Sequence, residues 1–409
     1  MTDFPATASR QAKLVIPAAL IVLGVGAAAH GLRWYPAEIL PHLLLNGVYC
    51  TLLGVSALVF FAIQRLTGAR WSASLRRIPE ALMQVLPVAS AGMLALFLAA
   101  KSLFPWMRPG IFTASSITAG KVQYLRAPQV FVRSLVTLSI WMLFCLLVRR
   151  TSLQQDREPE RALELHHRIT RYAVCFMPLF ALTFTFFVFD WLISLEPDWF
   201  STIFAFYMFA GTFVQGIAAV TLGAVLLRNG PATRHAVRED QLHDLGKMLF
   251  AFTTFLAYIW VCQYLLIWYG NIPEEVTHYL TRTSGPWLYV FALNFVINWV
   301  IPFTTLLSVR AKRSEGTLAG VSVLLLFGRW VDLFLLVIPS FSTTPQIGIS
   351  QLLIAAGCAS LSFWVVIQAL RRAPLVPAND PILAYERLER LHAAEPAVAG
   401  SIAVGGGSE

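Results

Sequence analysis

Residues 40–63 read LPHLLLNGVYCTLLGVSALVFFAI, an apolar run without a single Asp, Glu, Lys or Arg. A helix needs about 20 mostly apolar residues to cross the hydrocarbon core of a bilayer. Within that core every backbone polar group must find its hydrogen-bond partner inside the segment. A run of this length without a charged residue therefore predicts a transmembrane helix.

Similar runs on both sides of this stretch predict further spans. Hydrophobic residues make up 57% of the 409-residue chain and charged residues 13%, against about 25% charged in a typical soluble domain. No segment alternates as a membrane β-strand does. The predicted fold class is an all-α polytopic membrane protein of about ten transmembrane helices, in a domain covering residues 14–371. A short N-terminal segment, 1–13, and a tail expected to be partly disordered, 372–409, lie outside it. The predicted spans are residues 14–32, 40–63, 81–100, 129–148, 172–194, 201–227, 248–270, 286–308, 317–338 and 349–370.

Lys and Arg residues are distributed unequally between the predicted loops. With the N-terminus inside, 23 of the 31 lie on the inner side, six of these in the loop 149–171, and six lie outside. The remaining two, Arg133 and Arg329, fall within predicted helices. The positive-inside rule then places both termini in the cytoplasm. The net charge of +9 follows from this topology, and its spread over separate segments argues against a nucleic-acid partner.

The first predicted span leaves one alternative open. Arg10 and Lys13, the apolar run from Leu14 and the small residues 27–29 also fit a cleavable signal peptide. Residues 14–32 form a longer apolar run than the roughly 7–15 residues of a signal-peptide core, which favours a retained helix.

Cysteine and histidine spacing gives no metal or redox motif. Five cysteines lie singly in predicted helices, without CxxC, CxxCH or a four-cysteine iron–sulfur pattern. His30 and His42, near the outer ends of the first two helices, come closest to a haem-ligand pair. We therefore expect no metal site and no redox centre in this chain.

Ionisable residues inside the membrane are costly and mark functional hypotheses. Arg329 and Asp332, spaced i,i+3, share one helix face, either as a self-neutralising structural pair or as a working group. Asp190, with Glu196 and Asp198, forms an acidic group at the outer face. These three are either interfacial carboxylates or a mouth where a proton leaves or a quinol is deprotonated.

A second polar group opens the seventh predicted helix on the inner side. His243, Asp244 and Lys247 lie at its start, with Tyr264 further along. Such groups serve either as polar contacts between helices or as a proton-conducting string.

Two blocks of sequence are more particular than composition requires. Residues 189–204 read FDWLISLEPDWFSTIF and resemble a signature of the F subunit of bacterial alternative complex III, in the NrfD/PsrC-like membrane superfamily. Residues 243–247 (HDLGK), 250–252 (FAF), 263–264 (QY) and 267–275 (IWYGNIPEE) resemble the same family. A weaker match is KVQYL at 121–125, followed by Phe131 and Arg133, whereas FPWMR at 104–108 departs from the family pattern.

The resemblance implies two four-helix bundles, from predicted helices 2–5 and 6–9, with helices 1 and 10 at the flanks. It implies a subunit of a quinol:cytochrome c (or other electron acceptor) oxidoreductase, in a respiratory or photosynthetic chain of a bacterial cytoplasmic membrane. Haem c and iron–sulfur clusters would belong to partner subunits, which include a paralogous NrfD-like subunit. This chain would itself hold no cofactor and no catalytic residue, and would take part in proton translocation and assembly.

Carried over by position, the resemblance places a proton entrance at His243, Asp244 and Lys247. It places the exit at Asp190, Glu196, Asp198 and Glu274, with Arg329, Asp332 and Tyr264 between. The alternative is a quinol-binding anchor whose own site uses His30, His42, Arg133 and Asp190. A stand-alone transporter would show matching interrupted helices in inverted repeats, which the sequence lacks.

Overall fold

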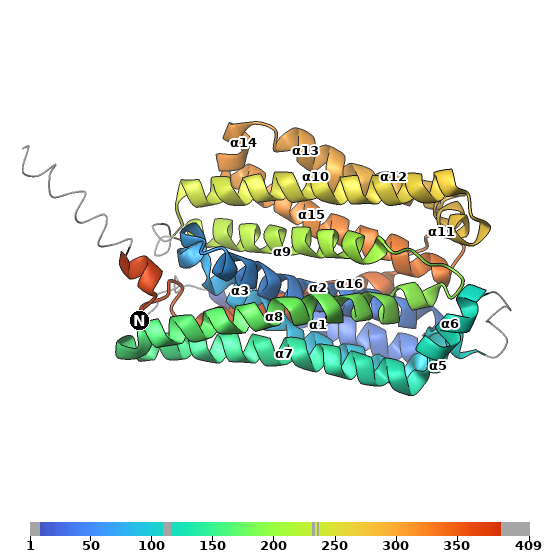
Figure 1. Ribbon diagram of the computed structural model, residues 1–409, viewed down its shortest axis with the longest axis horizontal. Coiled ribbons are helices and arrows are strands. Elements are labelled where there is room, and N and C mark those ends of the chain that lie inside the picture. The colour runs from blue at the N-terminus through green and yellow to red at the C-terminus, as the bar shows by residue number, and fades with distance from the viewer. Residues whose placement is uncertain (1–8, 109–115, 231–233, 235–236, 386–409) are drawn as a thin grey trace, which may run out of the picture.

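The computed structural model describes residues 9–108, 116–230, 234 and 237–385 (Figure 1). Throughout these residues the structure is helical without strands, and ten helical spans are long and apolar enough to cross a membrane. The predicted fold class and the predicted number of spans are thus confirmed.

Eight of the spans are continuous helices and two are broken. The continuous ones are α1 (Ser9–Trp34), α2 (Pro36–Leu66), α7 (Ala127–Arg157), α8 (Ala162–Trp191), α9 (Phe204–Arg228), α10 (Glu239–Gly270), α15 (Glu315–Val337) and α16 (Ile349–Arg371). The broken ones are α3 (Arg77–Leu82), α4 (Val85–Leu96) and α5 (Ala100–Leu103), and then α12 (Trp287–Phe295) and α13 (Ile301–Thr305). Shorter helices connect them: α6 (Ser116–Tyr124), α11 (Pro273–Thr283) and α14 (Val309–Arg313).

The region 149–171, predicted as an inner loop, is mostly helical. α7 continues to Arg157, and α8 begins at Ala162 after a turn at Pro159. Arg, Gln and Leu form helix readily whether or not they lie in lipid, so α7 continues beyond its apolar stretch. Helix breaks at Glu158 because a residue before proline is driven out of the helical conformation. Apolar length located the span but underestimated the helix.

The spans form two groups of four that share a wall. In the first, α2 packs on α4, α4 on α7, α7 on α8, and α8 returns to α2. In the second, α9 packs on α10 and α15, and the broken helix α12–α13 lies between α10 and α15. Packing of α2 on α9 joins the two groups, while α1 pairs with α16 at the flank (Figure 1). This is the two-bundle arrangement that the resemblance implied.

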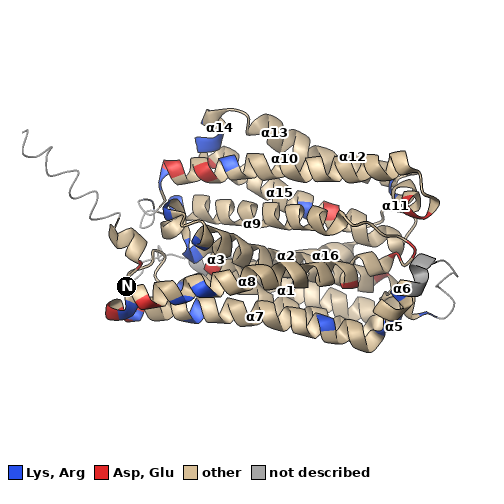
Figure 2. Cartoon of the chain, in the orientation of Figure 1, with Lys and Arg blue, Asp and Glu red and all other residues tan. Residues whose placement is uncertain are grey.

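Charged residues gather at one end of the bundles. Figure 2 shows Lys and Arg concentrated at the end that holds the α7–α8 turn and α14. α1 begins and α16 ends at this same end (Figure 1). By the positive-inside rule this is the inner end. We refer below to this end as inner and to the end with α6 and α11 as outer.

Gly24 allows α1 and α16 to cross closely. A Cβ at this position would lie 2.8 Å from the Cα of Gly357 and 2.8 Å from the carbonyl oxygen of Leu353. Helices in membranes associate through such small residues because lipid supplies no hydrophobic drive between them.

We expect Gly24→Val to separate α1 from α16 and to lower the stability of the chain by about 1–3 kcal/mol, as overpacking does. Gly26→Val is the matched control, since nothing lies within 4 Å of a Cβ at that position. Thermal unfolding of the purified chain in detergent measures both. Equal effects of the two substitutions would contradict the crossing.

Candidate functional site

A buried carboxylate in the second bundle is the centre of the candidate site. α15 places Arg329 and Asp332 one turn apart, 1% and 3% exposed, and the Arg329 guanidinium pairs with one oxygen of Asp332. The other oxygen accepts hydrogen bonds from the Tyr207 hydroxyl of α9 and from Asn294 Nδ2 of α12, the latter at 2.9 Å. The sequence predicted the pair on α15 but not its contacts with side chains of α9 and α12.

The backbone around this carboxylate is shaped to admit it. A Cβ at Gly211 would lie 2.5 Å from Arg329 Nη1, so only glycine leaves room for the guanidinium. Between α12 and α13 the chain passes through a π-helical turn, Val296–Val300, and Pro302 follows this turn. Proline removes a helix hydrogen bond, and π-turns recur at functional sites. Asn298 in this turn donates to Asn294 Oδ1 at 2.7 Å and to the Gly328 carbonyl at 3.0 Å.

Asp332 lines two small cavities of about 20 Å³ each, whose walls are mostly apolar with a few polar side chains. A buried water needs about 10–15 Å³, so each cavity has room for about one. The inner cavity lies on the side of the π-turn, and its polar side chains are those of Tyr207, Asn294, Asn298 and Trp299. The outer cavity lies nearer the outer end, and its polar side chains are those of Tyr207, Gln263, His278, Tyr279 and Arg282.

The outer cavity leads from Asp332 to a second ionic group. Glu196, in the turn after α8, pairs with His278 Nδ1 at 2.8 Å and with Arg282 Nη2 at 2.5 Å. Arg282 also donates to the carbonyls of Leu335 and Leu336, which follow Asp332 by one turn of α15. The sequence predicted a role for Glu196, but both of its α11 partners were missed.

The environment of this outer pair shifts both pKa values downward. Burial raises the pKa of Glu196, but Arg282 and His278 outweigh burial and hold it well below the ordinary 4.5. Burial lowers the pKa of His278 from 6.5, and the neighbouring Arg282 lowers it further. The Trp199 ring stacks on the imidazole with centroids 3.9 Å apart. At neutral pH the pair is therefore an ionised carboxylate facing a neutral histidine.

We expect stability to fall on acidification from about pH 6.5. Both folded pKa values lie below the unfolded ones, so the unfolded chain binds more protons. The stabilising contribution is complete above the unfolded pKa values, 6.5 and 4.5, and is lost as pH falls toward the folded ones. Unfolding midpoints between pH 8 and about pH 4 measure this. His278→Gln should reduce the loss that begins near pH 6.5, whereas His30→Gln, at an exposed site on α1, should leave the loss unchanged. The same pH profile in all three proteins would contradict the assignment.

The first bundle has its own intramembrane ion pair. Arg133 of α7 donates to Asp190 of α8 at 2.7 and 3.0 Å, and its guanidinium lies 3.8 Å from the centroid of the Tyr124 ring. An adjacent cavity of about 240 Å³ lies between the α6 region and the outer end of α8 with the turn that follows it. Its lining residues are Gly120, Lys121, Tyr124, Leu125, Phe189, Ile193, Ser194, Pro197 and Phe200. Lys121, in this wall, donates to the Trp199 carbonyl at 2.6 Å, and burial lowers the pKa of Lys121 to about 8.

The inner entrance predicted at the start of α10 forms a surface group. Lys247 Nζ lies 2.6 Å from Asp244 Oδ1, with the two side chains 55% and 31% exposed, and His243 is half-buried beside them. Asp244 precedes Leu256, a wall of the inner cavity, by twelve residues, or about 18 Å of helix. The structure does not place these three residues in contact with Asp332.

The remaining residues singled out from the sequence are dispersed. Asp198 and Glu274 are exposed at the outer end, and Tyr264 meets the Tyr279 ring edge-on at 5.1 Å. The four residues predicted for the alternative quinol site do not form a single group in the structure either. Arg133 and Asp190 pair between α7 and α8, His42 is buried beside Phe334, and His30 is exposed on α1.

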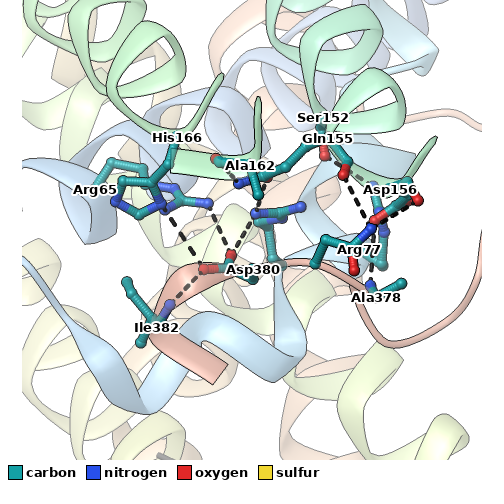
Figure 3. Close-up of polar contacts among 12 residues, drawn as sticks. Arg65, Arg77, Ser152, Gln155, Asp156, Ala162, His166, Ala378, Asp380 and Ile382 are labelled. Carbon is teal, nitrogen blue, oxygen red and sulfur yellow. Dashed lines mark hydrogen bonds and ion pairs between the residues drawn. The ribbon is translucent and has the colours of Figure 1, made fainter. Parts of the chain in front are cut away.

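A charged cluster at the inner end of the first bundle was not predicted (Figure 3). Glu80 of α3 is fully buried, and Arg76, Arg77 and Arg149 surround it. Asp380, in the segment after α16, pairs with Arg65 and Arg76, while Arg77 also pairs with Asp156. Arg77 and Glu80 have the same i,i+3 spacing that identified Arg329 and Asp332. That spacing was the signal in the sequence.

Across the part of the chain that the structure describes, no group of three or more His, Cys, Asp or Glu side chains could hold a metal ion. Comparison with protein-family models finds no matching family, and comparison with curated proteins finds no matching relative. The chain is a multi-pass, all-α membrane protein with ten candidate spans, whose ionisable side chains are buried in clusters within both bundles.

Proposed function

We propose that this chain is a membrane subunit of an alternative complex III-type quinol:electron-acceptor oxidoreductase in a bacterial cytoplasmic membrane, with no cofactor of its own. Its second bundle carries protons, and partner subunits with haem c and iron–sulfur clusters carry electrons. The sequence blocks at 189–204 and 243–275 support the assignment. The observation that carries the proton role is Asp332, a buried carboxylate that lines two water-sized cavities, each with several polar side chains in its wall.

Asp332 is the group that takes up and releases the proton. Water in the inner cavity would deliver a proton to the carboxylate, where Tyr207 and Asn294 fix its orientation. Water in the outer cavity would accept it and pass it to Glu196 through His278. Each transfer needs groups within about 2.6–3.2 Å or one bridging water, and the two cavities supply that water.

Arg329 prevents uncontrolled proton transfer through the site. When Asp332 binds a proton, the guanidinium becomes an unpaired buried charge, which costs several kcal/mol. Its Nη2 also lies 3.6 Å from Met208 Sδ, which is only a weak acceptor. Loading of the carboxylate therefore requires Arg329 to move, and such a movement is what a neighbouring redox subunit would have to drive.

A second candidate function, a quinol-binding anchor, is favoured by the cavity in the first bundle. An apolar cavity of about 150 Å³ accommodates benzene, so the 240 Å³ cavity has room for a quinol ring. The Tyr124 hydroxyl is buried there without a hydrogen-bond partner, and Lys121 and Ser194 supply further polar groups. Photolabelling by a quinone analogue at Phe189 or Phe200 would support this function, and labelling confined to another subunit would exclude it.

Purification tests the complex. A tagged chain extracted from native membranes in mild detergent should elute with subunits that carry covalent haem and iron–sulfur absorbance, and its own band should lack haem. Elution of the chain alone would contradict membership of such a complex and favour a stand-alone protein.

A further inference from the structure

The segment after α16 folds back onto the inner end of the first bundle. Its Asp380 is 1% exposed, accepts from Arg65 at 3.3 Å and from Arg76, and caps its own turn through the Ile382 amide (Figure 3). Burial raises the pKa of Asp380, but Arg76 and Arg65 outweigh burial and keep it below its ordinary value. An internal anion thus occupies a basic site.

This carboxylate leaves the basic site incompletely satisfied. Arg76 is 3% exposed, yet its Nη2 has no hydrogen-bond partner. Buried donors are rarely left unpaired, and such an atom calls for an explanation. The surrounding cluster has four arginines (Arg65, Arg76, Arg77 and Arg149) and three carboxylates (Glu80, Asp156 and Asp380), so one positive charge is uncompensated.

A cavity of about 60 Å³ is lined in part by Arg76, the residue that carries the unpaired donor. Arg65, Arg76 and His166 supply its polar wall, and Phe60 and Phe61 supply an apolar wall. His166 Nδ1 lies 3.1 Å from Arg65 Nη1 and 3.8 Å from Asp380 Oδ1, so the imidazole faces the same anion. The cavity therefore has one cationic side and one apolar side, and it lies at the inner end of α2.

We propose that this cavity binds the phosphate of an anionic phospholipid, and that Asp380 competes for the same cations. Phosphate offers more acceptor oxygens than a carboxylate and suits the planar fork of arginine. Basic pockets on the cytoplasmic side of helix bundles attract anionic head groups. Phe60 and Phe61 would contact the glycerol and the first acyl carbons. This site does not depend on the proposed proton role, because it lies in the other bundle and its readout is binding.

The test is a native mass spectrometry titration of the full chain, alone or in the complex with which it purifies. The ligands are phosphatidylglycerol, phosphatidylcholine and inorganic phosphate. One saturable phosphatidylglycerol adduct is expected, with phosphatidylcholine and inorganic phosphate at least about tenfold weaker. Arg76→Gln should weaken phosphatidylglycerol at least about tenfold, the size of one charge-assisted contact. Asp380→Asn should strengthen it, since the competitor is gone.

Exposed residues at the same end provide matched controls. Arg161→Gln and Glu164→Gln alter a surface ion pair in which the two side chains are 45% and 48% exposed, and should leave the affinity unchanged. If Arg76→Gln does not fold, His166→Gln, at a side chain 17% exposed, takes its place and should also weaken binding. Unchanged or weaker binding by Asp380→Asn would overturn the competition. Equal binding of phosphatidylcholine, or binding of inorganic phosphate alone, would overturn the assignment to an anionic lipid.

Discussion

Asp332→Asn is expected to remove about 3–5 kcal/mol of stability and to abolish proton transfer through the second bundle. The substitution leaves the Arg329 guanidinium 1% exposed and without its counter-charge, and loss of one partner of a buried ion pair has a cost of this size. The amide can still accept from Tyr207, but it cannot take up a proton. The unfolding midpoint in detergent and the yield of folded chain in the membrane measure the stability loss.

The double variant Arg329→Met with Asp332→Leu separates stability from function. Replacing both members of a buried pair by apolar residues is often neutral or stabilising. Its midpoint should therefore return to about the wild-type value, while proton transfer stays absent. A single variant as stable as wild type would contradict the buried pair, and a double variant that still transfers protons would contradict the role of the carboxylate.

Glu80→Gln is expected to have the largest effect at the inner end, about 3–5 kcal/mol of lost stability. One carboxylate here neutralises Arg77 at 2.6 Å, Arg76 at 3.1 Å and Arg149 at 3.2 Å, and it also accepts from the Ser152 hydroxyl at 2.5 Å. The amide leaves three guanidinium groups close together with less counter-charge. Urea or thermal unfolding of the purified chain measures the loss.

Glu164→Gln is the control for that experiment. Glu164 also contacts two arginines, Arg161 and Arg168, but its side chain is 48% exposed and water screens it. Its unfolding midpoint should remain that of the wild type. If the two variants unfolded alike, burial would not be what makes the Glu80 cluster important.

The fold followed from the sequence to the extent that apolar length controls it. All ten spans were located, because a bilayer selects for length and hydrophobicity alone. The polar ends of α7 and α8 were missed, since helices outside the bilayer need no apolar residues. The π-turn at 296–300 was also missed, because a turn of this kind depends on contacts with another helix, such as that of Asn298 with the Gly328 carbonyl of α15.

The site was predictable where its partners lie on one helix. Arg329 and Asp332 are three residues apart, so their spacing revealed the pair. Arg133 and Asp190 were each identified, but their contact depends on how α7 packs on α8. His278 and Arg282 lie in the short outer helix α11, where no apolar run makes a charge conspicuous.

The segment after α16 was predicted to be part of a partly disordered tail. Its first residues, up to 385, are instead bound to the first bundle, with Asn379 donating to the carbonyl of Asp156 at 2.9 Å. Arg65 and Asp380 are 315 residues apart, so no local pattern could have indicated the contact. The low-complexity stretch 405–407 lies outside the described residues.

The proton role of Asp332 is tested most directly by the number of protons released per quinol oxidised. The complex is reconstituted in vesicles with wild-type chain or with Arg329→Met/Asp332→Leu, and both quantities are recorded together. Quinol oxidation that continues at the wild-type rate, with only the protons of the quinol itself released, is the expected result. An unchanged ratio of protons to quinol in the double variant would contradict a proton path through Asp332.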